Sequence, residues 1–217
     1  MPARTALVTG GAGGLGRWVV AALVDAGWDV VVPVTAGSDL DAVDNVTTVV
    51  ADLTDPDDVA RAVAAAPDPL KAVVNLVGGF AAGQPVETTP LADFERMFTL
   101  NLRPTYLVTQ AALPRLRTAG GAIVCVGSAT ALDPFPGSAG YAASKAAVMA
   151  FTKAVAKEAG NVRANAIVPT MIDTPANRAS MPPEQHGKLV PPQRIAKTVA
   201  FLCDDASAAI NGAAVPV

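Results

Sequence analysis

The chain alternates short runs that are apolar at nearly every position with longer segments in which apolar residues recur at helical spacing. Runs that are apolar on both faces are typical of parallel strands covered by helices, and an amphipathic helix is the usual connection between two such strands. The apolar runs predict strands at residues 5–10, 29–34, 45–53, 71–78, 121–127, 161–169 and 213–217. The helical spacing predicts helices at residues 14–27, 55–66, 91–116, 140–159 and 193–204.

This alternation predicts the fold class. We expect an α/β fold, a Rossmann-type doubly wound and mostly parallel sheet of about seven strands with helices on both faces. No internal repeat or low-complexity linker interrupts the 217 residues, so we expect one domain over residues 1–217. The segment 169–191 is looser, and its pattern predicts no regular element.

A few residues indicate where elements begin or bend. Asp55 followed by Pro56 is typical of a helix start, because the aspartate accepts free N–H groups and proline fits the first turn. Pro104 predicts a kink in the long helix 91–116. Pro33 donates nothing to a strand ladder, so we place it near the carboxyl end of its strand.

Composition excludes several classes of partner. Hydrophobic residues make up 51% of the chain and charged residues 16%, with a net charge of -3, so no basic surface is offered to nucleic acid or to an anionic membrane. The apolar runs fall short of the about 20 residues that span a bilayer. His186 has no acids or cysteines beside it, and Cys125 and Cys203 form no cluster of ligands, so we expect no metal site. The two cysteines also form no disulfide framework, so we expect a cytoplasmic location.

The stretch TGGAGGLG at residues 9–16 joins the first predicted strand to the first predicted helix. In this context Gly10 allows a tight turn, Gly14 lets the backbone approach a pyrophosphate, and Gly16 lets the helix lie against the sheet. The phosphates would then meet free N–H groups at the positive end of the helix dipole. The alternative is a loop chosen for turning alone. The strand–turn–helix context favours a dinucleotide site.

The end of the second strand bears on which dinucleotide binds. NAD-binding sites usually offer a carboxylate there to the ribose 2′-hydroxyl, but this chain has Val34 and Thr35. Arg17 is more typical of a solvated helix residue, and Asp39 and Asp41 lie too far along the chain to count. We expect NAD(P), with a slight preference for NADP because the selective acid is absent.

Ser128, Tyr141 and Lys145 lie in VGSATALDPFPGSAGYAASK, residues 126–145. Tyr141 and Lys145 are one helical turn apart and share a helix face, where the ammonium would favour the phenolate. Ser128 ends a strand at the carboxyl edge of the sheet, where ligands bind. Each residue alone has an ordinary structural reading, but together beside a dinucleotide turn they indicate an acid–base site with Tyr141 transferring the proton.

These motifs resemble the classical short-chain dehydrogenases/reductases over nearly the whole chain. The glycine turn is similar to the family's cofactor turn, and the serine, tyrosine and lysine to its catalytic serine and YxxxK pair. The resemblance implies that Asn101 completes a proton relay from inside the fourth helix, and it implies a homodimer or homotetramer. It also implies cofactor contacts at Gly10, Gly14, Leu15, Gly16, Asp52, Leu53, Asn75, Gly78, Tyr141, Lys145, Pro169 and Thr174.

Three departures from the family pattern concern its branch and its C-terminus. NLVG at residues 75–78 replaces NNAG, and Pro169–Thr170 replaces PG. The chain stops at VPV where relatives usually continue, which puts a C-terminal strand in question. The loop at residues 173–182 and the VGGF at residues 77–80 are similar to quinoid dihydropteridine reductases. Those enzymes typically lack the serine, so Ser128 favours carbonyl chemistry.

The sequence therefore predicts an NAD(P)(H)-dependent oxidoreductase that moves a hydride between nicotinamide and a small ketone or secondary alcohol. Ser128 would orient the substrate oxygen, Tyr141 would act as general acid/base, and Lys145 would lower the pKa of Tyr141. Phe135, Met171 and Met181 are candidates for the substrate wall. Two alternatives stay open at this point: a pterin reductase of the same fold, and a nucleotide-sensing module without chemistry.

Overall fold

The computed structural model describes residues 4–38 and 43–217. Its strands are β1 (Thr5–Thr9), β2 (Asp29–Val34), β3 (Val46–Val50), β4 (Leu70–Asn75), β5 (Ala122–Val126), β6 (Arg163–Val168) and β7 (Ala214–Pro216). Its helices are α1 (Gly16–Asp25), α2 (Pro56–Ala64), α3 (Leu91–Asn101), α4 (Arg103–Ala119), α5 (Ala139–Glu158), α6 (Pro175–Ala179) and α7 (Pro192–Cys203). Short 3₁₀ turns are η1 (Ala129–Ala131), η2 (Pro183–Lys188) and η3 (Asp205–Ser207).

The described strands form one seven-stranded sheet in the order β3-β2-β1-β4-β5-β6-β7. Every recorded strand pair is parallel, which confirms the predicted fold class. The chain starts at the centre of the sheet, runs outward through β2 and β3, and returns to place β4 on the other side of β1. The order reverses between β1 and β4, and in such sheets ligands bind beyond the carboxyl ends of the strands at this point.

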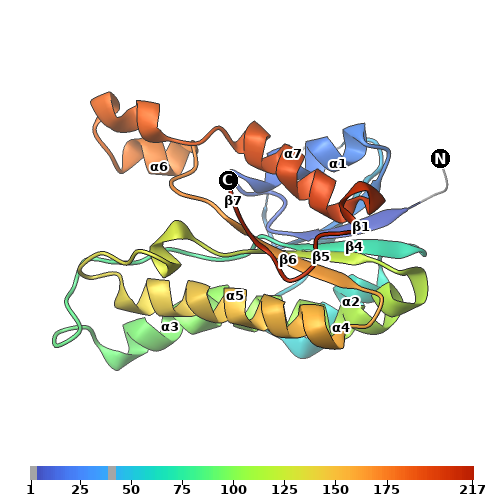
Figure 1. The fold of residues 1–217 in the computed structure, drawn as a ribbon, viewed down its shortest axis with the longest axis horizontal. Coiled ribbons are helices and arrows are strands. Elements are labelled where there is room, and N and C mark those ends of the chain that lie inside the picture. Colours follow the sequence, from blue (N-terminus) through green and yellow to red (C-terminus); the bar gives the residue numbers. More distant parts are fainter. Residues whose placement is uncertain (1–3, 39–42) are drawn as a thin grey trace.

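Helices cover both faces of the sheet (Figure 1). α1 and α7 lie on one face, and α2, α3, α4 and α5 lie on the other. The strands supply both cores, because neighbouring residues of a strand point to opposite faces. In β1, Leu7 packs into the core under α4 and α5, whereas Ala6 and Val8 pack into the core under α1 and α7.

The helix start and the strand proline are confirmed. The Asp55 carboxylate accepts hydrogen bonds from the backbone N–H groups of Asp57 at 2.9 Å and Asp58 at 3.0 Å, and Pro56 is the first residue of α2. Pro33 is the penultimate residue of β2 and is opposite Val49 of β3. Pairing of β2 with β1 is recorded only up to Val31. The missing N–H of Pro33 therefore falls beyond that ladder.

The single kinked helix predicted over 91–116 is wrong. The structure has two helices, α3 and α4, separated at Leu102. Pro104 falls in the first turn of α4, where a residue without an N–H leaves no intrahelical bond unmade. Asn101 is consequently the last residue of α3 rather than a residue inside a continuous helix. The looser segment 169–191 also contains a short helix, α6, that the pattern did not predict.

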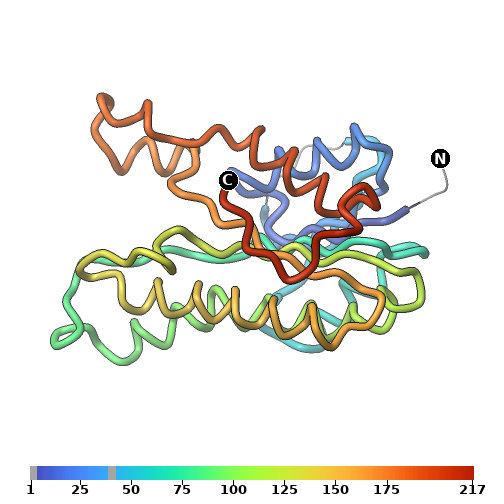
Figure 2. Tube along the Cα trace, in the orientation of Figure 1, coloured from blue at the N-terminus to red at the C-terminus, as the bar shows by residue number. Residues whose placement is uncertain are grey.

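The C-terminal strand, which the departure from the family pattern put in question, is formed. β7 pairs with β6, with Ala214 opposite Ala166 and Pro216 opposite Val168. Figure 2 traces this last segment, in red, along the edge of the sheet. β7 therefore extends the parallel sheet by one edge strand.

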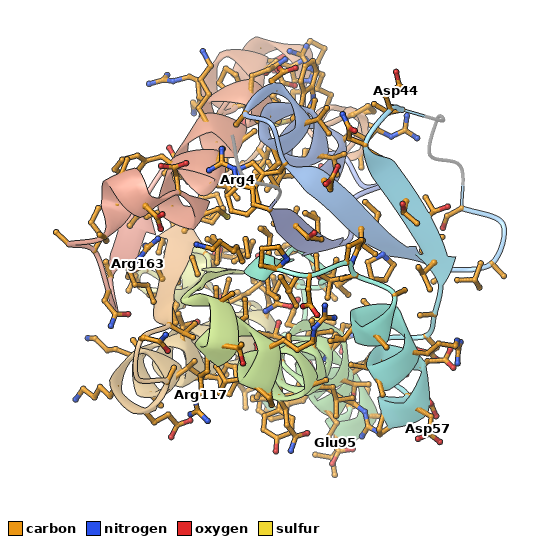
Figure 3. The ribbon with its side chains drawn as sticks, turned by 90° about the vertical axis from the view of Figure 1, so that its right-hand side faces the viewer. Arg4, Asp44, Asp57, Glu95, Arg117 and Arg163 are labelled. Carbon is orange, nitrogen blue, oxygen red and sulfur yellow. The ribbon has the colours of Figure 1, made fainter. Side chains whose placement is uncertain are left out.

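Several charged side chains lie on the outer surfaces of the helical layers. Figure 3 labels Asp57 of α2, Glu95 of α3 and Arg117 of α4, which lie at the periphery away from the sheet. Arg4 and Arg163, labelled in the same view, both bond near the C-terminus of α7. Arg4 pairs with the Asp204 carboxylate at 2.7 Å, and Arg163 donates to the Asp204 carbonyl at 3.0 Å. Among the described helices, none has the length and apolarity needed to cross a bilayer.

The close approach of α1 to the glycine turn generates a stability prediction. A Cβ on Gly16 would lie 2.0 Å from the Gly10 carbonyl oxygen and 2.7 Å from the Gly11 Cα. Both neighbours are backbone atoms, so α1 must move. We expect Gly16→Ala to lower the free energy of unfolding by roughly 1–3 kcal/mol in urea titrations. The control is Gly187→Ala, where an added Cβ meets nothing within 4 Å. Equal midpoints for the two variants would contradict the packing argument.

Candidate active site

The glycine turn lies at the carboxyl end of β1, next to the reversal of strand order. Gly10 adopts a left-handed φ of 68°, and its carbonyl accepts a bond from the Gly13 N–H at 3.0 Å. Gly14 is exposed and faces Thr174, whose methyl carbon would lie 2.7 Å from an added Cβ. Leu15 is half-buried and packs against the core under α1 and α7. Side chains in place of these glycines would fill the space beside the turn. With glycine there, the backbone stays open to a bound pyrophosphate, as a dinucleotide site requires.

A cavity of about 530 Å³ extends from this turn across the carboxyl ends of β2, β3 and β4. Four residues predicted to contact a cofactor line it: Gly10, Asp52, Leu53 and Gly78. The Asp52 carboxylate accepts bonds from the Thr54 N–H at 2.8 Å and the Thr54 hydroxyl at 2.7 Å. These two bonds lower the pKa of Asp52, so it presents a carboxylate to the cavity. Size and lining fit a dinucleotide.

The part of this cavity beyond β2 carries hydroxyl groups. The Thr35 and Ser38 side-chain oxygens lie 2.8 Å apart, and both residues line the cavity. Gly37 between them has a φ of 80°, which closes a tight turn. The Arg17 Nε donates to the Ala12 carbonyl at 3.1 Å. Asp39 and Asp41, named above for their distance along the chain, lie outside the described residues.

Ser128, Tyr141 and Lys145 come together at the carboxyl end of β5. Ser128 caps η1, accepting a bond from the Thr130 N–H at 3.2 Å, and its side chain lies close enough to the Tyr141 hydroxyl to lower the pKa of that phenol. Tyr141 is in the first turn of α5 and Lys145 is one turn later. A hydroxyl and a phenol that lie close together at a ligand-binding edge are able to hold one substrate oxygen between them.

Lys145 is 6% exposed, and its ammonium donates to the Val126 carbonyl at 3.0 Å. Burial disfavours the charged form and lowers the pKa of Lys145 to about 8. A Cβ on Gly78, a cavity residue, would lie 3.3 Å from the Lys145 Nζ. The ammonium therefore lies directly below the cavity floor, within reach of a ligand bound there.

With this geometry in place, comparison with known proteins identifies the family. A model described as short chain dehydrogenase matches residues 4–185. The chain belongs to the short chain dehydrogenase family. It is 35% identical to a 2-(R)-hydroxypropyl-CoM dehydrogenase of Xanthobacter autotrophicus over 79% of this chain and 76% of that one. It is 33% identical to a 3-beta-hydroxysteroid dehydrogenase of Comamonas testosteroni over 96% and 92%.

A solved structure described as a short chain dehydrogenase/reductase family protein is 31% identical and has a TM-score of 0.89, covering 98% of this chain and 94% of that one. The chain is thus an enzyme of this family, a dehydrogenase or reductase that uses NAD(P). The alternative of a binding module without chemistry is therefore wrong. The comparisons give no support to the local resemblance to dihydropteridine reductases, so we do not retain the pterin alternative.

In this dehydrogenase the pKa of Tyr141 is raised, although the sequence predicted that Lys145 would lower it. Burial raises the pKa of Tyr141, and the nearby Ser128 side chain opposes that rise only in part. The Lys145 ammonium is directed to the Val126 carbonyl. The loss of water contact disfavours the charged phenolate, and this effect of burial is the largest cause of the raised pKa of Tyr141.

Asn101 holds the segment that floors the cavity. Its Oδ1 accepts a bond from the Gly79 N–H at 2.9 Å, and its Nδ2 donates to the Gly79 carbonyl at 3.1 Å. The same Nδ2 donates to the Ser144 hydroxyl at 3.0 Å, which in turn donates to the Tyr141 carbonyl at 2.8 Å. Asn101 thus connects the end of α3 with the first turns of α5. Its role in a proton relay stays a prediction.

Asn75 lies at the end of β4 and bonds away from the cavity. Its Nδ2 donates to the Thr109 hydroxyl at 3.2 Å and to the Cys125 sulfur at 3.7 Å. It therefore links β4 to α4 and β5, and its predicted contact with the cofactor stays a prediction. Its Oδ1 is buried, with no hydrogen-bond partner among the described residues.

Pro169 and Thr174 lie on the segment that follows β6. The Pro169 carbonyl accepts a bond from the Ala129 N–H at 2.9 Å, which brings this segment next to η1. Thr174 caps α6 and faces the glycine turn as described above. The segment therefore spans from the Ser128 region to the cofactor turn, as residues lining a nicotinamide would.

Sequence reasoning missed Thr9 and Phe80. The Thr9 hydroxyl accepts from the Leu76 N–H at 3.1 Å, which holds the ends of β1 and β4 together below the glycine turn. The sequence feature that could have identified Thr9 is its position as a polar residue at the end of an apolar strand. The Phe80 ring contacts the Tyr141 ring with centroids 4.9 Å apart. The sequence indicates Phe80 only as part of the VGGF stretch at residues 77–80. Its contact with Tyr141 could not be predicted, because the two residues are far apart in sequence.

Burial of Lys145 predicts a pH-dependent stability. The pKa of Lys145 is about 8 in the folded state and has an ordinary value of 10.5, so between these values the unfolded chain binds more protons and stability rises with pH. Below about pH 8 the buried charge costs on the order of 3 kcal/mol. We expect Lys145→Met to gain stability relative to wild type at pH 7 and to lose about that much of its relative gain by pH 10.5.

Urea titrations across this pH range measure the difference between the two proteins. We compare Lys145→Met with the wild type because both proteins also lose stability above pH 9 through their buried thiols. The pKa values of Cys125 and Cys203 are raised by burial, so deprotonation favours the unfolded chain in both proteins. Lys153→Met, on the exposed face of α5, is the control. A relative stability of Lys145→Met that is flat with pH would show that the ammonium is not penalised by burial.

Proposed function

We propose that the chain catalyses reversible hydride transfer between NAD(P)(H) and a small ketone or secondary alcohol, with Tyr141 as general acid/base. The observation that carries this proposal is the placement of Ser128 close enough to Tyr141 to affect the pKa of its phenol, with Tyr141 one helical turn from the buried Lys145 and beside a cavity that fits a dinucleotide. The named relatives are dehydrogenases of 2-(R)-hydroxypropyl-CoM and of a 3-beta-hydroxysteroid. Both names refer to a carbon that bears a hydroxyl group.

The residues divide the chemistry as follows. When bound, NAD(P)(H) supplies the hydride to a carbonyl carbon or accepts it from a carbinol carbon. Ser128 and Tyr141 hold the substrate oxygen, and Tyr141 gives that oxygen its hydroxyl proton in reduction and takes the proton back in oxidation. Gly10, Gly14 and Gly16 would hold the pyrophosphate through backbone N–H groups. Lys145 would bind the nicotinamide ribose through its ammonium.

The raised pKa of Tyr141 suits the reductive direction. A phenol that stays protonated at neutral pH is ready to donate to a carbonyl oxygen, whereas oxidation needs the phenolate. The positive charges of Lys145 and of an oxidised nicotinamide would both favour that phenolate. We therefore infer that ketone reduction dominates near neutral pH and that alcohol oxidation accelerates as pH rises.

NADP is the finer part of the cofactor proposal. Thr35 and Ser38 line the cavity beyond β2, where a carboxylate would repel a 2′-phosphate. Hydroxyl groups are able to donate hydrogen bonds to phosphate oxygens without that repulsion. The expected homodimer or homotetramer stays a prediction. It is favoured by the outward-facing aromatic pair of Tyr106 and Phe151 on α4 and α5, whose ring centroids lie 5.9 Å apart.

The first test removes the proton that Tyr141 transfers. We expect Tyr141→Phe to lower kcat for carbonyl reduction by at least about 100-fold, as for the loss of a positioned acid/base. The rate is followed as nicotinamide absorbance over a panel of carbonyl compounds at saturating cofactor. The control is Tyr106→Phe, the other tyrosine of the chain. A folded, cofactor-saturated Tyr141→Phe enzyme with wild-type turnover would disprove the proposed mechanism.

The second test concerns the cofactor. We expect NADPH to bind about tenfold more tightly than NADH in fluorescence titrations, and Thr35→Asp to reverse this order by adding a like charge beside the 2′-phosphate. Thr35→Ser, which keeps the hydroxyl, is the matched control and retains the NADPH preference. Tighter binding of NADH to the wild type would refute the preference for NADP.

A further inference from the structure

Phe80 is a large apolar side chain in direct contact with the proposed acid/base. Its ring meets the Tyr141 ring edge-on, with the planes at 78°, which is an arrangement that aromatic pairs favour. Phe80 is nevertheless 64% exposed. Apolar side chains of this size are ordinarily buried. A ring that touches the reacting phenol and is still open to solvent forms a wall that a substrate held by Tyr141 would contact.

The backbone on both sides of Phe80 is held in place. The preceding residue, Gly79, is bonded through its N–H and its carbonyl to Asn101. Three residues after Phe80, the Gly83 N–H donates to the Gly137 carbonyl at 3.1 Å. A Cβ on Gly137 would lie 3.0 Å from the Gly83 backbone, so the two loops touch. Phe80 is therefore a positioned wall and not a freely moving loop side chain.

The segments that surround the Ser128–Tyr141 pair carry further exposed apolar side chains. Leu132 and Phe135 follow Ser128, and Met171 follows Pro169. Their exposed fractions are 65%, 47% and 47%. With Phe80, each of the segments 79–84, 128–138 and 169–174 therefore has at least one large exposed apolar side chain, and the segment 128–138 has two.

The few charged side chains of these three segments are all acidic. The segments contain no lysine, arginine or histidine, and their only ionisable side chains are those of Asp133 and Asp173. The next cation along the chain, Arg178, is paired with Asp173 through both carboxylate oxygens, with Nη2 2.7 Å from Oδ2. An anionic substituent on a substrate would lose water here and gain no counter-charge from these segments.

We propose that the substrate is an uncharged ketone or secondary alcohol carrying an aromatic or cyclic aliphatic group, and that Phe80 determines this specificity by packing against that group. The proposal rests on the proposed function and names its substrate class. Burying a ring against Phe80 favours such substrates over short aliphatic ketones, and these three segments offer no cation to a phosphorylated or carboxylated one.

The test compares acetophenone with 2-butanone, which lacks the ring, and with 4-acetylbenzoate, which adds a carboxylate. At saturating NADPH we expect kcat/KM for acetophenone to exceed the other two values by at least about tenfold. Phe80→Ala should raise KM for acetophenone about tenfold and leave that for 2-butanone nearly unchanged, because truncating a wall residue removes a binding contact. The control is Phe201→Ala, which removes another half-exposed phenylalanine, on α7.

A binding measurement gives a readout without turnover. Tyr141→Phe keeps the ring that Phe80 contacts but lacks the transferable proton. Loaded with NADPH, it should bind acetophenone at least about tenfold more tightly than 4-acetylbenzoate in isothermal titration. Adding Phe80→Ala to this variant should remove most of the acetophenone affinity.

The outcomes separate this proposal from the one it rests on. If carbonyl compounds are reduced in a Tyr141-dependent way but 4-acetylbenzoate or 2-butanone is preferred, only the substrate class is wrong. The same holds if Phe80→Ala leaves the ratio of acetophenone to 2-butanone unchanged, or if the two aryl ketones bind equally. If the wild type reduces no carbonyl compound and Tyr141→Phe behaves like it, the proposed function itself fails.

Discussion

The site is organised around the ammonium of Lys145, which is buried in the protein and held by one backbone carbonyl at the end of β5. A charge in this position needs a neighbour without a side chain, and Gly78 provides it. The backbone after Gly78 must also stay in place, and Asn101 holds it by hydrogen bonds to the N–H and the carbonyl of Gly79. The helical turn between Lys145 and Tyr141 then determines where the phenol lies. The depressed pKa of Lys145 indicates that folding tolerates an unfavourable burial for the sake of this arrangement.

The parallel sheet brings these residues together. Strands that all run the same way end at one edge, so the glycine turn after β1, Gly78 after β4 and Ser128 after β5 lie at that edge although they are far apart in sequence. Gly10 and Gly78 line one crevice there. The reversal of strand order beside β1 opens that crevice for a ligand. α5 begins at the same edge and presents Tyr141 to Ser128. The segments after β4, β5 and β6 leave the sheet at the same edge, and their residues 79–84, 128–138 and 169–174 include no lysine, arginine or histidine.

Several features followed from the sequence because they are local. The alternation of apolar runs with helical segments predicted the α/β sheet, and Asp55 with Pro56 predicted the start of α2. Other features depended on contacts between distant segments. The helix predicted over 91–116 breaks at Leu102, since Pro104 suits the first turn of a new helix while Asn101 bonds to Gly79 from another part of the chain. The pKa of Tyr141 rises rather than falls because burial, which the sequence does not reveal, outweighs the opposing influence of Ser128.

The sequence by itself determined the periodicity of the elements, the glycine turn and the one-turn spacing of Tyr141 and Lys145, since each depends on residues close together along the chain. The tertiary structure alone decided that Ser128 meets Tyr141, that Gly78 covers the Lys145 ammonium, and that Phe80 packs on the reacting phenol. Those contacts join segments tens of residues apart, and their geometry is fixed by strand order and loop packing. Hydrogen-bond direction and burial are properties of that packing, so no pattern along the chain encodes them.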